Sequence, residues 1–338
     1  MPKEGRCELF LEFINKVICA GDEEATNWLL DYSAHLFQRP WEPPEVAILL
    51  RGRQGVGKSM FVESLGEILG NYFLAITQTK HLVGCFNVHL QDKLLVFAEE
   101  ASFAGDRSYA GILKTLITQT TMAVEPKGVN VFAAKKYFRL FMASNENWMV
   151  PVDIDDRRYF VLDVSPVRQN DHAYFEALKE EWTNGGREAF YFVMLNRDIS
   201  KFNYRRRPET PALHEQKLHS LRGAAARIYE MLETGWAPIL SFERDRVFVS
   251  TRGLRRVAGN WENDYTERAL AVELTKIAIG RTSVRLTIER QQIRGFWLPS
   301  LKEAHEQWEK ANNLRVKWLD PEATWKAFDR KNYENCPF

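Results

Sequence analysis

The sequence predicts an α/β fold with a five-stranded parallel sheet, preceded by helices and followed by a C-terminal α+β module. Short apolar segments alternate with helical patterns between residues 45 and 164. Such alternation is typical of a parallel sheet whose two faces are both covered by helices. The chain of 338 residues is long for one domain and short for three. A polar, basic, proline-bearing run, NYRRRPETP (203–211), marks the best boundary.

The elements before this boundary follow from local patterns. Residues 7–37 carry apolar side chains at helical spacing and predict two helices, which RPWEPP (39–44) brings to an end. TMAVE (121–125) and VNVF (129–132) flank Pro-Lys-Gly and predict a β-hairpin. Residues 171–200 predict further helices. The expected sheet strands are EVAILL (45–50), YFLAI (72–76), KLLVFA (93–98), FRLFMAS (138–144) and YFVLDV (159–164).

The C-terminal part has a mixed pattern. Helices are expected at 213–234 and 264–279, and a basic, β-like segment is expected at 281–299. We therefore expect three regions: an N-terminal helical lead-in (1–44), a core (45–202) and a C-terminal α+β module (203–338).

Composition limits the class of protein. Hydrophobic residues make up 45% of the chain, and 21 Phe, 11 Tyr and 10 Trp can form a sizeable core, which excludes disorder as the main state. No apolar run approaches the ~20 residues of a membrane-spanning helix, so we expect no membrane association. The net charge of +1 limits any nucleic-acid site to a local patch. A start without a secretory signal and four cysteines without CxxC spacing predict a cytoplasmic protein, in the host cell if it is viral.

The segment GRQGVGKS (52–59) follows an expected strand and opens an expected helix, and it matches G-x-x-x-x-G-K-[ST]. Its glycines let the backbone wrap a phosphate, with N–H groups and a helix N-terminus facing the anion. We expect Lys58 to reach the β- and γ-phosphates and Ser59 to hold Mg²⁺. The alternative is a chance glycine-rich turn, and a random match to this motif in a chain of this length has a probability on the order of 1%. The predicted ATP-binding residues are Gly52, Arg53, Gln54, Gly55, Val56, Gly57, Lys58 and Ser59.

Polar residues follow three of the other strands. Glu99 and Glu100 end the strand in KLLVFAEEA, where we expect Glu99 to bind Mg²⁺ and Glu100 to polarise the attacking water. On its own, such a pair more often starts a solvated helix. Asn145 ends FRLFMASN and can orient the water near the γ-phosphate, unless it only starts a turn. Arg157 and Arg158 precede the last strand and suit an arginine finger or, equally, an ion pair with a neighbouring aspartate at 155 or 156.

The set of motifs resembles a known family. GRQGVGKS, LLVFAEEA, LKTLITQTTMAVEPKG, MASN and DDRRYFVLDV resemble, in order and spacing, the Walker A, Walker B, B-prime, sensor and arginine-finger elements of superfamily 3 helicase domains. These P-loop, AAA+-like domains are fused to phage and plasmid primases and primase–polymerases. The resemblance covers residues 8–165. Beyond 210, only GFWLPSL, which is preceded by basic residues, resembles a family element, the wing of a C-terminal winged-helix module. One departure is Glu99, where relatives often have Asp.

The resemblance implies a ring-forming DNA helicase, a homo-hexamer that uses ATP and Mg²⁺ and moves 3′→5′ on single-stranded DNA in phage or plasmid replication. It implies hydrolysis at subunit interfaces, with Arg158, ahead of Arg157, as the finger. The B-prime hairpin of the family projects into the ring's pore, so Lys127 is the expected DNA contact. Lys114, on a predicted helix, and Lys135, expected beyond the hairpin, are weaker candidates. A solvated hairpin tip is the alternative for Lys127.

Other functions remain open from the sequence. An initiator-type ATPase would bind origin DNA and remodel it without processive unwinding, and a nucleotide-gated interaction module would have negligible turnover. No carboxylate pair outside the ATPase suits primase or polymerase chemistry, so we expect a fused or associated primase–polymerase. The histidines of HEQKLH (214–219) lie five apart and point ~140° apart on a helix, so we expect no zinc site there. The basic runs at 205–207 and 281–294 are open to DNA contact or to simple solvation.

Overall fold

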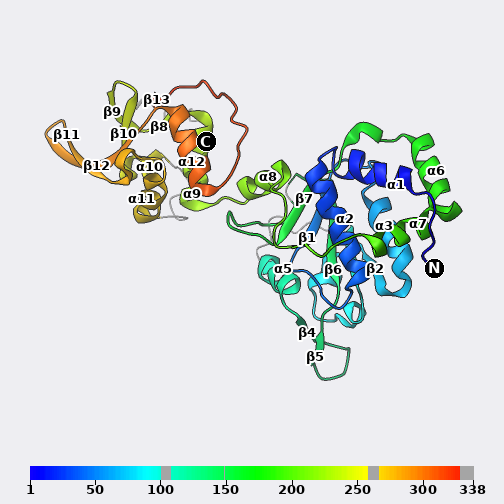
Figure 1. Cartoon of the computed structure of the whole chain (residues 1–338). Coiled ribbons are helices and arrows are strands. Elements are labelled where there is room, and N and C mark those ends of the chain that lie inside the picture. Colours follow the sequence, from blue (N-terminus) through cyan, green and yellow to red (C-terminus); the bar gives the residue numbers. More distant parts are fainter. Residues whose placement is uncertain (100–107, 148, 258–265, 328–338) are drawn as a thin grey trace. The chain divides into compact units, whose positions relative to one another are not determined.

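The computed structural model describes residues 1–99, 108–147, 149–257 and 266–327 (Figure 1). The chain forms two compact units, Met1–His219 and Ser220–Phe338. The division follows helix α8 (Pro211–His219) and so lies beyond the basic run at 203–211. Helix α8 belongs to the first unit because it packs on strand β7 and buries Ala212 and Leu213 in that unit's core.

The first unit is built on a parallel five-stranded sheet in the order β2–β3–β6–β1–β7. Each of the five apolar segments forms one strand, so the predicted α/β fold with a parallel sheet is confirmed. Strand β1 lies between β6 and β7, and the carboxyl ends of the three strands therefore meet at one edge. The strands are β1 (Ala47–Arg51), β2 (Phe73–Ile76), β3 (Leu95–Glu99), β6 (Arg139–Ser144) and β7 (Tyr159–Asp163).

The two faces of the sheet belong to two separate cores, because successive residues of a strand point to opposite faces. In β1, Ile48 and Leu50 contribute to one core, and Ala47 and Leu49 contribute to the other. Helices α1, α2, α3, α6 and α7 pack in the first core, and α4, α5 and α8 pack in the second (Figure 1). The helices are α1 (Glu8–Phe13), α2 (Glu23–Gln38), α3 (Lys58–Leu69), α4 (Thr79–Val83), α5 (Ser108–Thr118), α6 (His172–Glu181) and α7 (Arg187–Asn196).

The N-terminal helices share the core of the sheet. Helix α1 continues into a π-helical turn at Ile14–Ile18, and α2 begins after Asp22, whose side chain accepts a hydrogen bond from the amide of Ala25 at 2.9 Å. Phe10 and Phe13 are fully buried in the first core. The lead-in predicted at 1–44 is therefore part of the same compact unit as the sheet.

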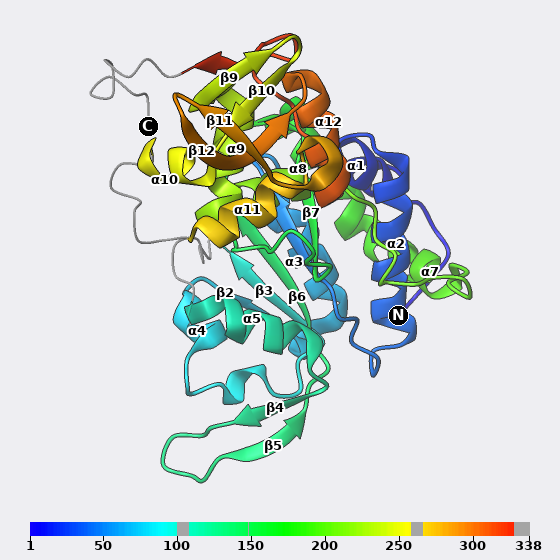
Figure 2. The same ribbon diagram turned by 90° about the vertical axis from the view of Figure 1, so that its left-hand side faces the viewer.

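The predicted hairpin forms from β4 (Thr121–Val124) and β5 (Phe132–Lys135), which pair antiparallel and extend away from the sheet (Figure 2). Its tip turns at Gly128, which has φ +78°, and the amide of Val129 donates to the carbonyl of Pro126 at 3.3 Å. The second strand begins at Phe132, the last residue of the segment predicted for it, instead of at Val129. Lys135 therefore lies in β5, opposite Thr121, and the expectation that it lies beyond the hairpin is wrong.

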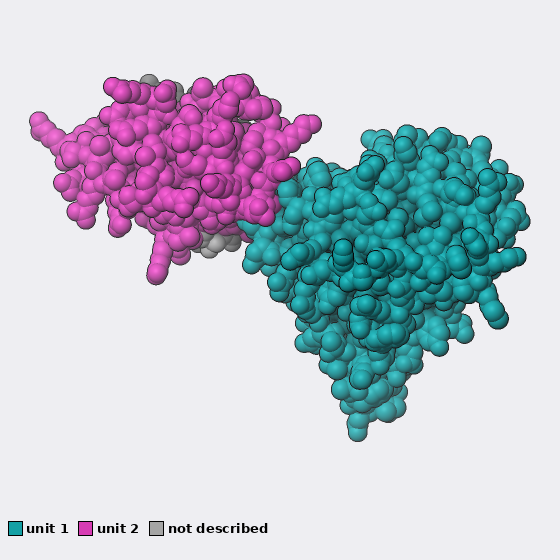
Figure 3. Space-filling model, in the orientation of Figure 1, with its two compact units in different colours: residues 1–219 teal, residues 220–338 magenta. Residues whose placement is uncertain are grey.

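The second unit (magenta in Figure 3) contains an antiparallel sheet in the order β11–β12–β10–β9. The helix expected at 213–234 is two helices, α8 and α9, which are separated at 220–222. The basic segment at 281–299 folds back on itself as the hairpin β11–β12. The helices and strands of the second unit, within its described residues, are α9 (Gly223–Thr234), β8 (Trp236–Ala237), β9 (Ile239–Glu243), β10 (Arg246–Val249), α10 (Thr251–Val257), α11 (Glu267–Thr275), β11 (Val284–Ile288), β12 (Gln291–Leu298), α12 (Leu301–Asn312) and β13 (Lys326–Ala327). In the described ranges of both units, no helix has the length and apolar character to cross a bilayer.

Candidate nucleotide-binding site

A cavity of about 240 Å³ lies at the carboxyl edge of the sheet. It is lined by residues 54–60, which connect β1 to α3, and by Glu99 at the end of β3 and 143–145 at the end of β6. Crevices at the carboxyl ends of parallel strands are where open α/β sheets bind ligands. The cavity therefore gathers the glycine-rich loop, a carboxylate and an amide that lie far apart in the sequence.

The loop at 52–57 requires glycine at two positions. Gly55 has φ +77° and Gly57 has φ +95°, in the region that disfavours residues with a Cβ. A Cβ on Gly57 would lie 2.9 Å from the rings of Phe13 and Phe175, and one on Gly55 would lie 2.3 Å from Oδ1 of Asn170. Gly57 is also the N-cap of α3, so the N-terminus of that helix opens into the cavity.

Lys58 is the first residue of α3 and is buried, with 8% of its surface exposed. Its ammonium group donates to the carbonyl oxygens of Gly52 and Arg53, the latter at 2.8 Å, and to Oδ1 of Asn145 at 2.8 Å. The lysine therefore connects the loop to the end of β6, and two of the residues predicted to be catalytic, Lys58 and Asn145, are in direct contact.

The hydroxyl of Ser59 donates to Oε1 of Glu99, so the two predicted magnesium ligands also meet. Burial, together with the charges of Glu99 and then Glu67, raises the pKa of Glu63 nearby. In the described part of the chain, no three His, Cys, Asp or Glu side chains form a metal-binding group. One hydroxyl and one carboxylate fit Mg²⁺, which is usually bound by one or two protein ligands together with phosphates and water.

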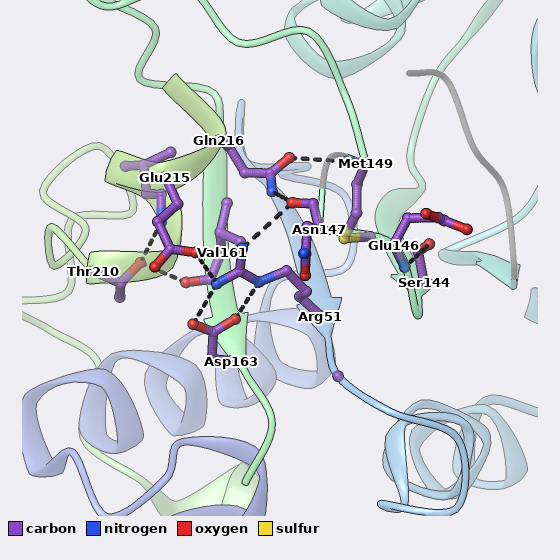
Figure 4. A network of polar contacts seen from close by, with 12 residues as sticks. Arg51, Ser144, Glu146, Asn147, Met149, Val161, Asp163, Thr210, Glu215 and Gln216 are labelled. Atoms are coloured by element: carbon purple, nitrogen blue, oxygen red, sulfur yellow. Dashed lines mark hydrogen bonds and ion pairs between the residues drawn. The ribbon is translucent and has the colours of Figure 1, made fainter. Parts of the chain in front are cut away.

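The segment after β6 is held by a polar network (Figure 4). Gln216 of α8 donates through Nε2 to the carbonyl of Asn147 and accepts at Oε1 from the amide of Met149 at 2.9 Å. Arg51, the last residue of β1, donates from Nη1 to the same Asn147 carbonyl at 3.3 Å. The network thus holds the backbone two and four residues after Asn145.

Arg51 is held in turn by two carboxylates. It binds Asp163 at the end of β7, with Nη2 2.6 Å from Oδ2, and Nη2 lies 2.6 Å from Oε2 of Glu215 on α8 (Figure 4). Burial acts to lower the pKa of Arg51, but the hydrogen bonds and charges of Asp163 and Glu215 outweigh it and raise the pKa. Its side chain is only 9% exposed, so the guanidinium is a fixed charge.

Arg157 and Arg158 lie at the opposite edge of the sheet from the cavity. The carbonyl of Arg158 accepts from the amide of Ala47, the first residue of β1, whereas the loop follows the last residue of that strand. Five residues of strand separate the two edges by about 15 Å. Nη1 of Arg158 lies 3.2 Å from Oδ2 of Asp156, whose side chain is buried, and Arg157 is exposed. Neither arginine can reach the cavity of its own chain from this position.

The predicted DNA contacts are spread over two elements, and one catalytic residue cannot be placed. Lys127 is exposed at the hairpin tip, and Lys135 is exposed on β5. Lys114 on α5 forms an ion pair with Asp153. Glu100, the expected water-polarising residue, lies outside the described residues.

Several residues of the site had not been predicted. Asn170 donates its amide to the carbonyl of Gly55 at 3.2 Å, and Gln169 donates through Nε2 to the carbonyl of Gln54 at 3.0 Å, so the turn after β7 supports the loop. Nothing in the local sequence indicates this contact. Arg51 and Asp163 did carry a signal, because opposite charges end two apolar strand segments that neighbour each other in the sheet.

Comparisons with known proteins support the fold of the chain. A model of a family of unknown function, DUF5906, matches residues 50–158. The DNA primase-polymerase of Nitratiruptor phage NrS-1 is 28% identical over 188 residues, which are 54% of this chain and 26% of that relative. Solved apo structures of the NrS-1 C-terminal region superpose with TM-scores of 0.63 and 0.65 at 17% identity and cover 88% of this chain and 77% of theirs. This chain, which spans about a quarter of the curated relative, is thus related to a phage primase-polymerase and has the fold of the NrS-1 C-terminal region.

Proposed function

We propose that the chain is an ATP-dependent DNA helicase of the superfamily 3 type that acts in phage or plasmid replication. The observation that carries the proposal is the convergence of Lys58, Ser59, Glu99 and Asn145 on one cavity beside a glycine-rich loop. On this proposal, the loop is a P-loop that binds the phosphates of ATP, and the second unit is a winged-helix-like module. The relationship to a phage DNA primase-polymerase supports a role in DNA replication, in the cytoplasm of the host cell.

The residues at the cavity have distinct roles in this proposal. Lys58 exchanges its contacts with the loop carbonyls for the β- and γ-phosphates, whose charge it neutralises. Ser59 and Glu99 hold Mg²⁺, which neutralises phosphate charge when it is bound. Asn145 orients the attacking water, and Glu100, on the sequence expectation, polarises it. Because Lys58 already contacts Asn145, a γ-phosphate that bound between them would change the contacts of both residues at once.

The position of Arg158 supports a site shared between subunits. Arg158 lies at the opposite edge of the sheet and so cannot contact a nucleotide in the cavity of its own chain, but in a ring it could enter the cavity of the adjacent subunit. We propose a homo-hexamer in which Arg158, rather than the more exposed Arg157, enters the adjacent site. Subunits with Arg158→Ala and subunits with Lys58→Ala should then regain part of the ATPase activity when they are mixed. If mixing restores nothing and a monomer hydrolyses ATP at the full rate, the shared site is wrong.

Single-stranded DNA is the proposed second substrate, and Lys127 is its proposed contact. The lysine lies at the tip of a projecting hairpin, joined to the amino end of β6 and so away from the cavity. Lys135 is the second candidate, and Lys114 is the weakest because Asp153 already neutralises it. We also propose that the chain works with a primase–polymerase, either fused to it or associated with it, since its relative carries that name.

The deciding experiment measures ATP hydrolysis with and without single-stranded DNA, followed by strand displacement on a tailed duplex. We expect Lys58→Ala to abolish hydrolysis and Lys16→Ala, an exposed lysine of the same chain, to leave it unchanged. Negligible turnover of the wild type would indicate a nucleotide-gated interaction module instead.

One observation favours a second function, an initiator-type ATPase that remodels origin DNA. On the hairpin β11–β12, the exposed Arg285 and Arg294 lie directly opposite each other. Like charges in opposite positions destabilise a strand pair, so an anionic partner such as duplex DNA would relieve them. DNA-stimulated hydrolysis without strand displacement would decide for this second function.

A further inference from the structure

We propose that Gln216 is a positioning residue for Asn145, and that helix α8 thereby sets the rate of nucleotide hydrolysis. The inference rests on the proposed function. It concerns the segment at 145–147, which leaves the end of β6 with exposed side chains. Apolar anchoring resumes only at Met149 and Val150, which are fully buried. Polar contacts must therefore fix the part of this segment that carries Asn145.

Gln216 makes the central contacts of the segment. It is fully buried, it donates to the carbonyl of Asn147, and it accepts from the amide of Met149 at 2.9 Å. Both ends of one side-chain amide thus hold the backbone two and four residues after Asn145. A buried amide that lost either contact would leave polar groups unpaired, so the arrangement favours one position of the segment.

Arg51 adds a second donor to the same point. Its Nη1 lies 3.3 Å from the Asn147 carbonyl, and its other nitrogens are held by Asp163 and Glu215 (Figure 4). Arg51 directly precedes the loop, and the amide of Gly52 donates to the carbonyl of Ser144 at 3.2 Å. A backbone hydrogen bond and the side chain of Arg51 therefore both connect the start of the loop to the end of β6 and the segment after it.

Helix α8 can hold this position because it is itself anchored to the sheet. The hydroxyl of Thr210 donates to the carbonyl of Val161 in β7 at 2.5 Å and accepts from the amide of Leu213 at 3.2 Å, which caps the helix. Leu213 is fully buried in the second core. A helix fixed to β7 and β1 thus presents Gln216 to the segment that follows β6.

The test compares the loss of these polar contacts with a loss of packing elsewhere in the first unit. Gln216→Met keeps the length of the side chain but removes both polar contacts, whereas Met194→Ala on α7 removes only packing in the first core. We expect Gln216→Met to lower kcat about tenfold or more, because small misplacements of a catalytic group are costly, while the Kd for ATP changes less than about twofold. Met194→Ala should lower Tm and leave kcat unchanged well below its Tm. A folded Gln216→Met variant with the wild-type kcat would overturn the inference.

A second variant keeps the inference testable if Gln216→Met does not fold. Glu215 is half exposed, and Glu215→Gln weakens only the ion pair that orients Arg51. We expect kcat to fall about two- to fivefold, again with an unchanged Kd. In that case a wild-type kcat for Glu215→Gln would overturn the inference. If the wild type hydrolyses no ATP, the proposed function is wrong. If the wild type hydrolyses ATP and these variants hydrolyse it at the wild-type rate, only the inference is wrong.

Discussion

The shape of the loop predicts a specific loss of stability for Gly57→Ala. The new methyl group would lie 2.9 Å from the rings of Phe13 and Phe175, at a residue whose φ is +95°. The backbone strain costs about 1–2 kcal/mol. Forcing a methyl group against two packed rings costs about 1–3 kcal/mol more. We therefore expect the free energy of unfolding of the first unit to fall by about 2–5 kcal/mol.

Gly21→Ala provides the matched control. Gly21 also has a positive φ, +83°, but a Cβ there would meet nothing within 4 Å, so only the strain of about 1–2 kcal/mol applies. Calorimetry of the first unit's transition should show Tm falling by about 10 °C for Gly57→Ala and about 4 °C for Gly21→Ala. On the proposed function, ATP affinity should fall only for Gly57→Ala. Equal shifts in Tm would refute the close packing of the rings against the loop.

Three further predictions concern charged residues. Arg158→Ala should retain nucleotide binding, measured by equilibrium titration, and lose about 10³–10⁵ of the hydrolysis rate; an unchanged rate would exclude the finger. Lys127→Ala should leave basal hydrolysis intact but abolish unwinding of a tailed duplex and weaken the salt dependence of DNA binding. Lys135→Ala should reduce unwinding and the salt dependence to a smaller extent. Full unwinding by Lys127→Ala would mean that the DNA binds elsewhere. A hydrogen bond from His214, outweighing the opposing effect of burial, lowers the pKa of Glu209 to about 2. This carboxylate therefore stabilises the fold above its unfolded pKa, and the stabilisation is lost as pH falls toward 2. Since the group is partly exposed, Glu209→Gln should lower the free energy of unfolding at pH 7 by about 1 kcal/mol or less and converge with the wild type near pH 2; a difference that persists there would contradict the assignment.

The sequence predicts the sheet well because its strands are buried on both faces. A strand such as Ala47–Arg51 is apolar at successive positions, and this pattern does not depend on contacts elsewhere in the chain. The contact between Lys58 and Asn145 was also predictable, since parallel strands bring their carboxyl ends to one edge. The hairpin was predicted, but the start of its second strand was not, because the turn at Gly128 leaves three residues unpaired before Phe132.

The residues that the sequence could not reveal act across long stretches of chain. Gln216 reaches Met149 from a helix that begins 62 residues later in the sequence, and no local pattern marks this glutamine as buried. Asn170 has the same property: its contact with Gly55 exists only because the turn after β7 returns to the loop. Secondary structure follows from nearby residues, whereas these supports follow from the tertiary arrangement.

Strand β6 connects the two halves of the proposed mechanism. It begins at Arg139, four residues after β5 of the hairpin ends, and it is followed directly by Asn145, which contacts Lys58. This six-residue strand is paired with β3 on one side and with β1 on the other. If DNA pulls on Lys127, as proposed, the load would pass through β6 to the segment that carries Asn145. On the proposed function, this connection explains why DNA should stimulate hydrolysis, and why Lys127→Ala should remove the stimulation without removing the basal rate.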